Sequence, residues 1–421
     1  MRVGSVLFVV VCVLGAACGP SPASNPAPAA SGNPAPPAAG AAPGGSGASQ
    51  AASGAELLIG GTVALSGPFS EPGRWYQRVW EWYFRDLNAR GGLLGRPVKL
   101  ILYDDESDPN KAASLYERLI TVDKVDLLLG PYPTPTDAAV IPIAERNGMV
   151  LVQGGTAATS LLRGRNNQYT FTAFTALDAD WAKVWVDWIS TLPEAQRPRT
   201  VAIFTLNNPF TLGIQKGLPD QVASAGMRVA VNEVYDQGTT DFTALVQRAR
   251  AANVDAVALL SYFPDSVLLT RTLAEQGLKP KTAYNAISSG LPTWTTDLKE
   301  LGEYAVTSVQ VWHTFPFKDV DRLARFIQDE FKVDFIPASA GWAMTVAQVL
   351  QAGVEGCGRV DQDCIAEWLR THPVETASGQ LKFDREGIPE YFLALAQVQG
   401  GKNVIIYPPN LATAPAVYPI P

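Results

Sequence analysis

Apolar runs typical of buried strands alternate with segments of helical periodicity over most of the chain, and this alternation restricts the fold more than any other feature. The runs LLIGGTVAL and KLILYDD, which begin at Leu57 and Lys99, are separated by the helix-like segment GRWYQRVWEWYFRDLNARGG. Further along, VDLLLG and MVLVQ also flank a helix-like segment. Strands that alternate with helices predict an α/β fold, in which helices cover both faces of a parallel sheet.

Glycine and capping residues mark the ends of the expected helices. Gly91 and Gly92 follow the first helical segment and are typical of a helix end. Asp108, which precedes Pro109, offers an N-cap and a first-turn proline for the next helix. Five apolar residues of the first helical segment lie on one face: Tyr76, Val79, Trp80, Tyr83 and Leu87.

One pattern of segments occurs twice. The stretch LYDDESDPNKAASLYERLITVDKVDLLLGPYPTPT matches VYDQGTTDFTALVQRARAANVDAVALLSYFP in its order of features. Both contain Tyr-Asp, a polar turn, an amphipathic helix, Val-Asp, an apolar strand, and then a tyrosine with a nearby proline. The match predicts two similar α/β lobes rather than one long sheet.

Hydroxyl and glycine residues follow two successive strands. The strand VDLLLG ends at a loop that contains Thr134 and Thr136, and MVLVQ ends at a loop that contains Gly155 and Thr156. In parallel sheets, ligands bind beyond the carboxyl ends of the strands, where helix N-termini offer free N–H groups. Each loop alone is more typical of an ordinary N-cap or tight turn. Two such loops, together with SYFP in the second half, favour a ligand-binding cleft.

The N-terminus has the features of a secretory signal. Arg2 precedes the apolar run VLFVVVCVLGAA, which ends in small residues before Cys18. This arrangement resembles the lipobox of bacterial lipoproteins, in which the cysteine is lipidated, although Gly15 stands where that motif usually has leucine. Secretion with an incidental cysteine is the alternative. Residues 19–55 are almost wholly Gly, Pro, Ala and Ser, a composition that predicts a disordered tether.

Several segments resemble the leucine/isoleucine/valine-binding-protein-like receptors of bacterial ABC importers. They follow one another in consistent order over residues 56–410: VALSGPFSEPG, YDDESDPNKAASLYERLI, LLLGPYPTPT, VLVQGGTAAT, LSYFPDSVLLTRTLAEQGL and GQLKFDREG. The resemblance implies a type I periplasmic-binding-protein fold, in which two Rossmann-like lobes with parallel sheets are joined by three crossover strands and close by a hinge motion. It implies a first lobe of residues 57–177 plus 308–385 and a second lobe of residues 178–307 plus 386–412.

The same resemblance implies a set of ligand-binding residues. In this family a hydroxyl in the loop after VDLLLG binds the ligand carboxylate, which places Thr134 in that role. The family's usual threonine in the next loop falls near Ala157, so Thr156 or a backbone N–H would substitute. The full set is Thr134, Gly155, Thr156, Ala157, Phe210 and Tyr262, where Phe210 replaces one of two family tyrosines.

The resemblance fails at the residue that would pair with an amino group. The family's acid in the second lobe falls near Ala286, in the segment YNAISSG, which contains no carboxylate. A buried ammonium without a partner costs several kcal/mol. The ligand is therefore not a simple α-amino acid, or another acid such as Asp265 or Glu71 pairs with it.

Other classes of function lack support in the sequence. Charged residues make up 17% of the chain, with 33 Lys and Arg against 40 Asp and Glu, which is not the footprint of a nucleic-acid-binding protein. Neither histidine, His313 or His372, belongs to a metal-binding or triad motif, and we expect no catalytic residue, metal or cofactor. His313 is expected at the rim or in packing. The helically spaced Trp181, Trp185 and Trp188 are expected in the core or on a lobe surface.

We therefore expect an extracytoplasmic, membrane-anchored lipoprotein that captures a branched-chain or other hydrophobic amino acid for an ABC permease. A receptor for a hydrophobic or aromatic carboxylate or amide is the alternative, and a ligand sensor for a signalling partner is another. Cys12 would leave with the signal and Cys18 would carry lipid, so Cys357 and Cys364 remain for a disulfide, which an extracytoplasmic location permits.

Overall fold

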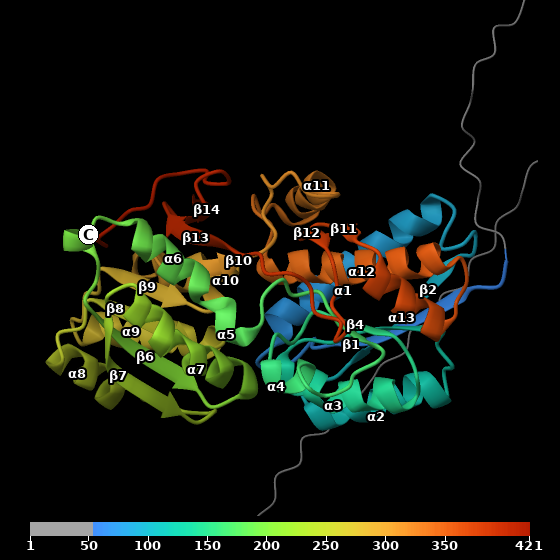
Figure 1. Cartoon of the computed structure of the whole chain (residues 1–421), viewed down its shortest axis with the longest axis horizontal. Helices are drawn as coiled ribbons and strands as arrows, with labels where there is room; N and C mark the ends of the chain where they lie inside the picture. Colours follow the sequence, from blue (N-terminus) through green and yellow to red (C-terminus); the bar gives the residue numbers. More distant parts are fainter. Residues whose placement is uncertain (1–53) are drawn as a thin grey trace, which may run out of the picture. The chain divides into compact units, whose positions relative to one another are not determined.

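The computed structural model describes residues 54–421, which form two mainly parallel sheets covered by helices (Figure 1). The expected signal, the Cys18 lipidation site and nearly all of the tether lie outside the described residues. Among residues 54–421, no helix combines the length and the apolar character that crossing a membrane requires. The α/β prediction is confirmed.

The first sheet contains five parallel strands in the order β2-β1-β3-β4-β5. Its strands are β1 (Leu57–Val63), β2 (Val98–Asp104), β3 (Leu127–Leu129), β4 (Leu151–Gln153) and β5 (Thr170–Thr172). The residues of β1 pair in register with those of β2 along the whole strand, from Leu57 opposite Val98 to Val63 opposite Asp104. The strands expected from the apolar runs are thus present.

The second sheet contains seven strands in the order β14-β13-β10-β9-β8-β6-β7. Its strands are β6 (Thr200–Leu206), β7 (Arg228–Tyr235), β8 (Ala256–Leu260), β9 (Thr282–Asn285), β10 (Val306–Val309), β13 (Ala394–Gln399) and β14 (Lys402–Tyr407). The parallel strands β7-β6-β8-β9-β10 repeat the order of the first sheet, which confirms the two-lobe prediction. The antiparallel hairpin β13–β14 extends this sheet beyond β10.

Seven helices and a small hairpin accompany the first sheet in the described part of the chain: α1 (Ser70–Ala89), α2 (Pro109–Thr121), α3 (Thr134–Arg146), α4 (Thr159–Leu162), α11 (Val320–Phe331), α12 (Ala338–Cys357), α13 (Gln362–Thr371), β11 (Val374–Thr376) and β12 (Gly379–Leu381). Helices α1 and α12 cover one face of this sheet, and α2 and α3 cover the other (Figure 1). The helices next to the second sheet are α5 (Asp178–Trp181), α6 (Lys183–Thr191), α7 (Pro209–Ser224), α8 (Thr243–Ala251), α9 (Phe263–Glu275) and α10 (Thr293–Leu298).

The chain passes between the two sheets in three segments, 173–177, 310–319 and 382–393, and hydrogen bonds connect all three. Gln310 accepts a bond from the backbone N–H of Thr175 at 3.2 Å and donates to the carbonyl of Ala173 at 3.0 Å. The N–H of Phe392 donates to the carbonyl of Thr175 at 2.8 Å. Because Gln310 is buried, these bonds are shielded from water and hold the crossing segments together.

Helix α1 follows the sequence prediction closely. Its expected apolar face is buried, and Gly91 and Gly92 after its end adopt positive φ angles of 111° and 74°. Glycine tolerates these angles because it has no Cβ. Trp80 on the buried face donates from Nε1 to the carbonyl of Ala343 at 2.9 Å, which fixes α1 against α12.

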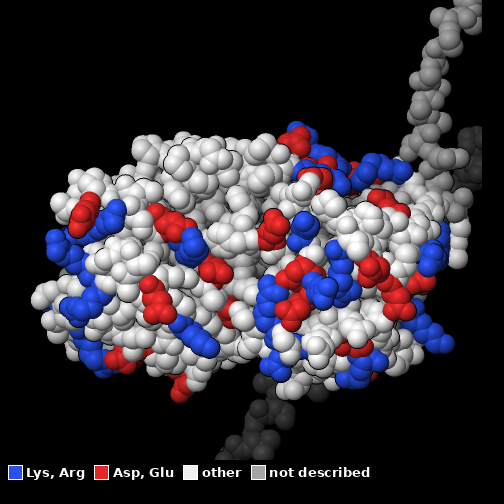
Figure 2. Space-filling model, viewed as in Figure 1, with Lys and Arg blue, Asp and Glu red and all other residues white. Residues whose placement is uncertain are grey.

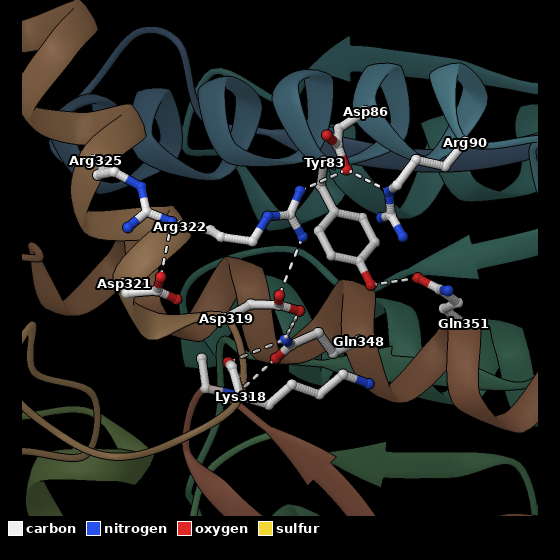
Figure 3. A network of polar contacts seen from close by, with 11 residues as sticks. Tyr83, Asp86, Arg90, Lys318, Asp319, Asp321, Arg322, Arg325, Gln348 and Gln351 are labelled. Carbon is white, nitrogen blue, oxygen red and sulfur yellow. Dashed lines mark hydrogen bonds and ion pairs between the residues drawn. The ribbon is translucent and has the colours of Figure 1, made fainter. Parts of the chain in front are cut away.

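A polar network links α1, α11 and α12 on the side away from the sheet (Figure 3). The Arg322 guanidinium on α11 contacts Asp86 of α1 at 2.6 Å and Asp319, the N-cap of α11, at 3.1 Å. Gln348 of α12 donates to the Asp319 carboxylate at 3.3 Å and to the Lys318 carbonyl at 3.4 Å. The network therefore fixes the position of α12 through Gln348, and with it the position of the residues at the N-terminus of α12.

Cys357 and Cys364 form a disulfide in the structure, with their Cα atoms 5.8 Å apart. Helix α12 ends at Cys357, and Gly358 follows in the left-handed region with a φ of 72°. Asp361 then caps α13 by accepting a hydrogen bond from the N–H of Cys364 at 3.0 Å. The bridge thus joins the end of one helix to the first turn of the next.

Opening this bridge is expected to lower the free energy of unfolding, because the bridge restricts the conformations of the unfolded chain. The expected loss is only about 2–3 kcal/mol, because the loop that the bridge closes is short. Urea unfolding of the Cys357→Ser/Cys364→Ser variant should show a lower midpoint with an unchanged slope. The wild type with its thiols reduced and alkylated should match the variant. An unchanged midpoint in both samples would contradict the prediction.

Candidate ligand-binding site

The strand order places a crevice at the carboxyl edge of each sheet. β1 lies between β2 and β3, so the loops that follow β1 and β3 lead to opposite sides of the sheet. β6 occupies the equivalent position between β7 and β8. Parallel sheets bind ligands at such points, where neighbouring loops diverge.

A narrow cavity, which we call the inner cavity, lies where loops from both sheets meet. Its lining combines residues that follow β3, β4, β6, β8 and β9 with residues of a crossing segment, of α5 and of α12. The lining residues are Tyr132, Thr134, Gly155, Ala157, Phe174, Trp181, Phe210, Tyr262, Ile287 and Trp342. All of the predicted ligand residues except Thr156 are among them.

A second narrow space, the outer cavity, adjoins the first. The two share Tyr132, Tyr262, Ile287 and Trp342. The remaining residues of the outer cavity are Pro68, Phe69, Pro72, Phe263, Ser288, Leu291, Ala338 and Ser339. The cavities are thus neighbours on either side of one group of four side chains.

Larger depressions are present elsewhere on the described part of the molecule, around Arg370 and around Leu278. The first includes Gln168, which precedes β5, and the second includes Lys279, which precedes β9. Both therefore lie toward the amino ends of parallel strands, where this kind of sheet does not bind ligands.

Gln153, the last residue of β4, shapes the glycine loop of the inner cavity. Its Oε1 accepts hydrogen bonds from the N–H groups of Gly155 at 3.0 Å and Thr156 at 2.8 Å, and its Nε2 donates to the Thr156 carbonyl at 2.9 Å. Thr134, the first residue of α3, donates from Oγ1 to the Gly155 carbonyl at 3.2 Å. The two predicted loops are therefore in direct contact, as the order of the strands suggested.

The hydroxyl of Thr156 does not line either cavity. It accepts a hydrogen bond from the N–H of Ala158 at 3.0 Å and so stabilises its own turn. The N–H of Ala157 has no backbone hydrogen-bond partner within residues 54–421, and Ala157 lines the inner cavity. Of the two substitutes considered for the missing family threonine, the geometry favours the backbone N–H.

Aromatic rings form most of the wall of the inner cavity. Trp342 stacks on Tyr132 with ring centroids 6.2 Å apart and meets Phe174 edge-on at 4.9 Å. Trp181 meets Phe210 edge-on at 5.3 Å. Such contacts hold large apolar side chains in fixed orientations.

Apart from Phe210 and Tyr262, the residues of these walls were not predicted from the sequence. Trp181 was expected in the core or on a lobe surface because it shares a helical spacing with Trp185 and Trp188. It is buried, lines the inner cavity and donates from Nε1 to the Ala286 carbonyl at 2.8 Å. Phe174 and Trp342 were missed, because nothing in their local sequence distinguishes them from core residues.

No charged side chain lines either cavity. Glu71 accepts a hydrogen bond from the Thr293 hydroxyl, and Asp265 accepts one from the Tyr235 hydroxyl at 3.3 Å, but neither acid lines a cavity. His313 is also absent from the lining. The outer surface of the molecule, unlike the cavity lining, carries charged side chains, with Lys and Arg intermixed with Asp and Glu on the face drawn in Figure 2.

One acid, Asp137 of α3, is buried directly behind the inner cavity. Neither of its carboxyl oxygens makes a hydrogen bond of normal geometry within the described residues. A Cβ added to Gly155 would lie 2.5 Å from its Oδ2, so only glycine fits between this carboxyl and the cavity. Burial raises the pKa of Asp137 well above its usual value, and the nearby Gly155 N–H opposes this only in part.

Two lobes whose parallel sheets present their carboxyl edges to shared cavities define a two-lobed solute-binding protein. The family model for periplasmic binding proteins matches residues 56–402. The chain belongs to this family, whose members are binding proteins.

Relatives and solved structures agree with this assignment. A leucine-, isoleucine-, valine-, threonine- and alanine-binding protein of Pseudomonas aeruginosa is 26% identical over 333 residues, which cover 77% of this chain and 86% of the relative. A leucine binding protein from Thermotoga maritima has a TM-score of 0.74 at 20% identity and covers 83% of this chain and 97% of its own. A solute binding protein from R. palustris in complex with benzoate has a TM-score of 0.73 at 18% identity, with coverages of 86% and 97%. At these identities the two solved structures show the fold alone.

Asp137→Asn is expected to change the pH dependence of stability. Because the folded state raises the pKa of Asp137, it holds this proton more tightly than the unfolded chain does. The resulting stabilisation is complete below the unfolded pKa, near 3.9, and is lost as pH rises through the folded pKa. Asparagine does not ionise, so the variant does not lose stability as the pH rises. At pH 7 the variant should therefore unfold at a higher urea concentration than the wild type.

Asp241→Asn provides a control of opposite sign. Asp241 is exposed, and the hydrogen bond from the Thr243 N–H lowers its pKa. Its stabilisation is present above the unfolded pKa and is lost as pH falls through the folded pKa. Urea midpoints measured from pH 2 to pH 8 cover the transitions of both carboxyls, and a lower midpoint for Asp137→Asn than for the wild type at pH 7 would contradict the prediction.

Proposed function

We propose that this protein is the extracytoplasmic solute-binding component of an ABC importer, which captures a small solute between its lobes and delivers it to a permease. The family supports a binding role, and the cavities lie where both sheets end. Membrane attachment through Cys18 and the tether of residues 19–55 would keep the receptor close to its permease. Enzymatic activity is not part of the proposal.

The uncharged, aromatic lining is the observation that carries the choice of ligand. A solute bound here would contact ring faces and edges, the Thr134 and Tyr262 hydroxyls, and the N–H of Ala157. Thr134 is the first residue of α3 and Phe210 lies in the first turn of α7, so both helices direct their positive dipole ends toward the cavity. This environment suits a carboxylate or amide head group on an apolar or aromatic body.

A hydrophobic amino acid is the second candidate, because the relative from Pseudomonas aeruginosa is named for such ligands. Its ammonium group would need an acceptor, and Ala286 occupies the position of the family's acid. Burying that charge with only neutral partners costs several kcal/mol. A sensor that regulates a signalling partner would use the same lobes and cavities, and direct transport measurements distinguish that role.

A ligand that binds only the folded state should raise the stability of the purified protein by RT ln(1 + [L]/Kd), or about 2.7 kcal/mol at 100 times Kd. Thermal unfolding with benzoates, arylalkanoates, their amides, and leucine, isoleucine and valine tests the proposal. We expect carboxylates or amides without an amino group to give the largest shifts. Shifts with the three amino acids alone would establish the second candidate, and no shift with any solute would contradict importer function.

Thr134→Val should weaken binding, because it keeps the shape of the side chain but removes the hydroxyl, which would turn from the Gly155 carbonyl to donate to the ligand. Loss of one hydrogen bond to a charged group corresponds to about 1.5–3 kcal/mol, or roughly a ten- to hundredfold higher Kd by calorimetry. Thr136→Val is the matched control, because Thr136 is buried in the same helix turn without lining either cavity. Equal affinities of the wild type and Thr134→Val would show that the head group binds elsewhere.

A further inference from the structure

The outer cavity lies at the N-termini of three long helices. Phe69 precedes the first residue of α1, Tyr262 precedes that of α9, and Ala338 and Ser339 begin α12, which has 20 residues. All four line the cavity. The first N–H groups of a helix have no partner inside the helix, and the helix dipole makes this end positive, so all three helices favour an electron-rich group here.

Ser339 supplies an independent indication that this space receives a ligand. The side chain is completely buried, and its Oγ has no hydrogen-bond partner within the described residues. Buried hydroxyls are usually paired, because an unpaired one loses its bonds to water without replacement. The neighbouring hydroxyl of Ser288 is already used, since it donates to the Ser266 Oγ at 2.9 Å.

The inner and outer cavities adjoin each other, with volumes of about 20 Å³ for the outer and about 10 Å³ for the inner cavity, so a ligand that occupies both would enter when the lobes move apart. Tyr132, Tyr262, Ile287 and Trp342 border both spaces, so an apolar ligand body held among them has its head group in the inner cavity and its other end in the outer one. Trp342 and Ser339 lie three residues apart on α12, and residues at this spacing share a helix face. The residue that stacks on Tyr132 and the unpaired hydroxyl therefore face the same space.

We propose that the outer cavity is a second subsite, in which the Ser339 hydroxyl donates a hydrogen bond to a neutral oxygen at the far end of the ligand. The inference rests on the proposed function and narrows its ligand class to carboxylates or amides with an apolar middle and a distal hydroxyl or carbonyl oxygen. The lining contains no lysine or arginine, and the proposed head group already places one negative charge in the adjoining inner cavity, so a second carboxylate would be repelled by the first. A neutral acceptor satisfies Ser339 without that cost.

The test compares ligands that differ only in the distal group. Benzoates and 3-phenylpropanoates that carry either a 4-methyl or a 4-hydroxyl substituent provide two lengths of matched pairs. Calorimetry on the wild-type protein should give the hydroxyl member of at least one pair a roughly three- to tenfold lower Kd, the range expected for one neutral hydrogen bond. Ser339→Ala should abolish this preference and leave the Kd of the methyl member unchanged.

Ser289→Ala is the matched control. Ser289 is also a buried serine whose Oγ has no partner in the described residues, but it lines neither cavity. This variant should keep the wild-type preference, and unchanged thermal unfolding would show that both variants are folded.

Wild-type protein that binds both members of every pair equally, or a preference that survives in Ser339→Ala, would overturn the subsite while leaving the proposed function intact. Failure of every carboxylate, amide and amino acid to bind would overturn the proposed function and the subsite together.

Discussion

The parallel direction of the strands determines what kind of site this molecule can have. Every parallel strand delivers the chain to the carboxyl edge of its sheet, and the helix that follows begins there with unpaired N–H groups. Because the five parallel strands of each sheet have the same order, the equivalent loops after β3 and β8 carry Thr134 and Tyr262 into one cavity. The polar character of the site therefore comes from backbone dipoles and hydroxyls, and no charged side chain is needed in its lining.

Helix α12 contacts the aromatic walls of the site near its N-terminus and other parts of the first lobe further along. Trp342, near its N-terminus, contacts the rings of Tyr132 and Phe174, while further along Gln348 accepts a hydrogen bond from the N–H of Ala377 at 2.7 Å. Gln348 also contacts Asp319, so the network of Figure 3 and the turn between β11 and β12 both constrain the helix. A side chain at a helix N-terminus can hold a ring in a fixed orientation only if the helix itself does not slide, and these contacts prevent sliding.

The parts of the structure that could be predicted from the sequence are those that depend on a few adjacent residues. The buried face of α1 and the strands β1 and β6 were predictable, because periodicity and strand length are properties of a few adjacent residues. Thr134 was predicted from its place after an apolar strand and Tyr262 from the family resemblance, and both line the inner cavity. Trp342 and Ser339 belong to α12, which is about 200 residues away from Thr134 in the sequence. No pattern in their local sequence predicts that they lie near Thr134 in the fold. Thr156 was one of two candidates to replace the family's threonine, the other being a backbone N–H. Its hydroxyl accepts a hydrogen bond from the N–H of Ala158, because short loops often satisfy their own backbone groups first.

Asp137 lies close to the proposed carboxylate site, and its pKa explains why it would not oppose an anion there. Its carboxyl lies beside Gly155, which lines the inner cavity, and an ionised carboxylate there would repel an anionic ligand. Burial raises the pKa of Asp137, which favours the neutral form and removes that repulsion. A bound anion would raise this pKa further, because like charges favour protonation of the weaker acid. Binding of the proposed carboxylate and protonation of Asp137 are thus mutually reinforcing, whereas an ammonium group at the same position would favour loss of the proton.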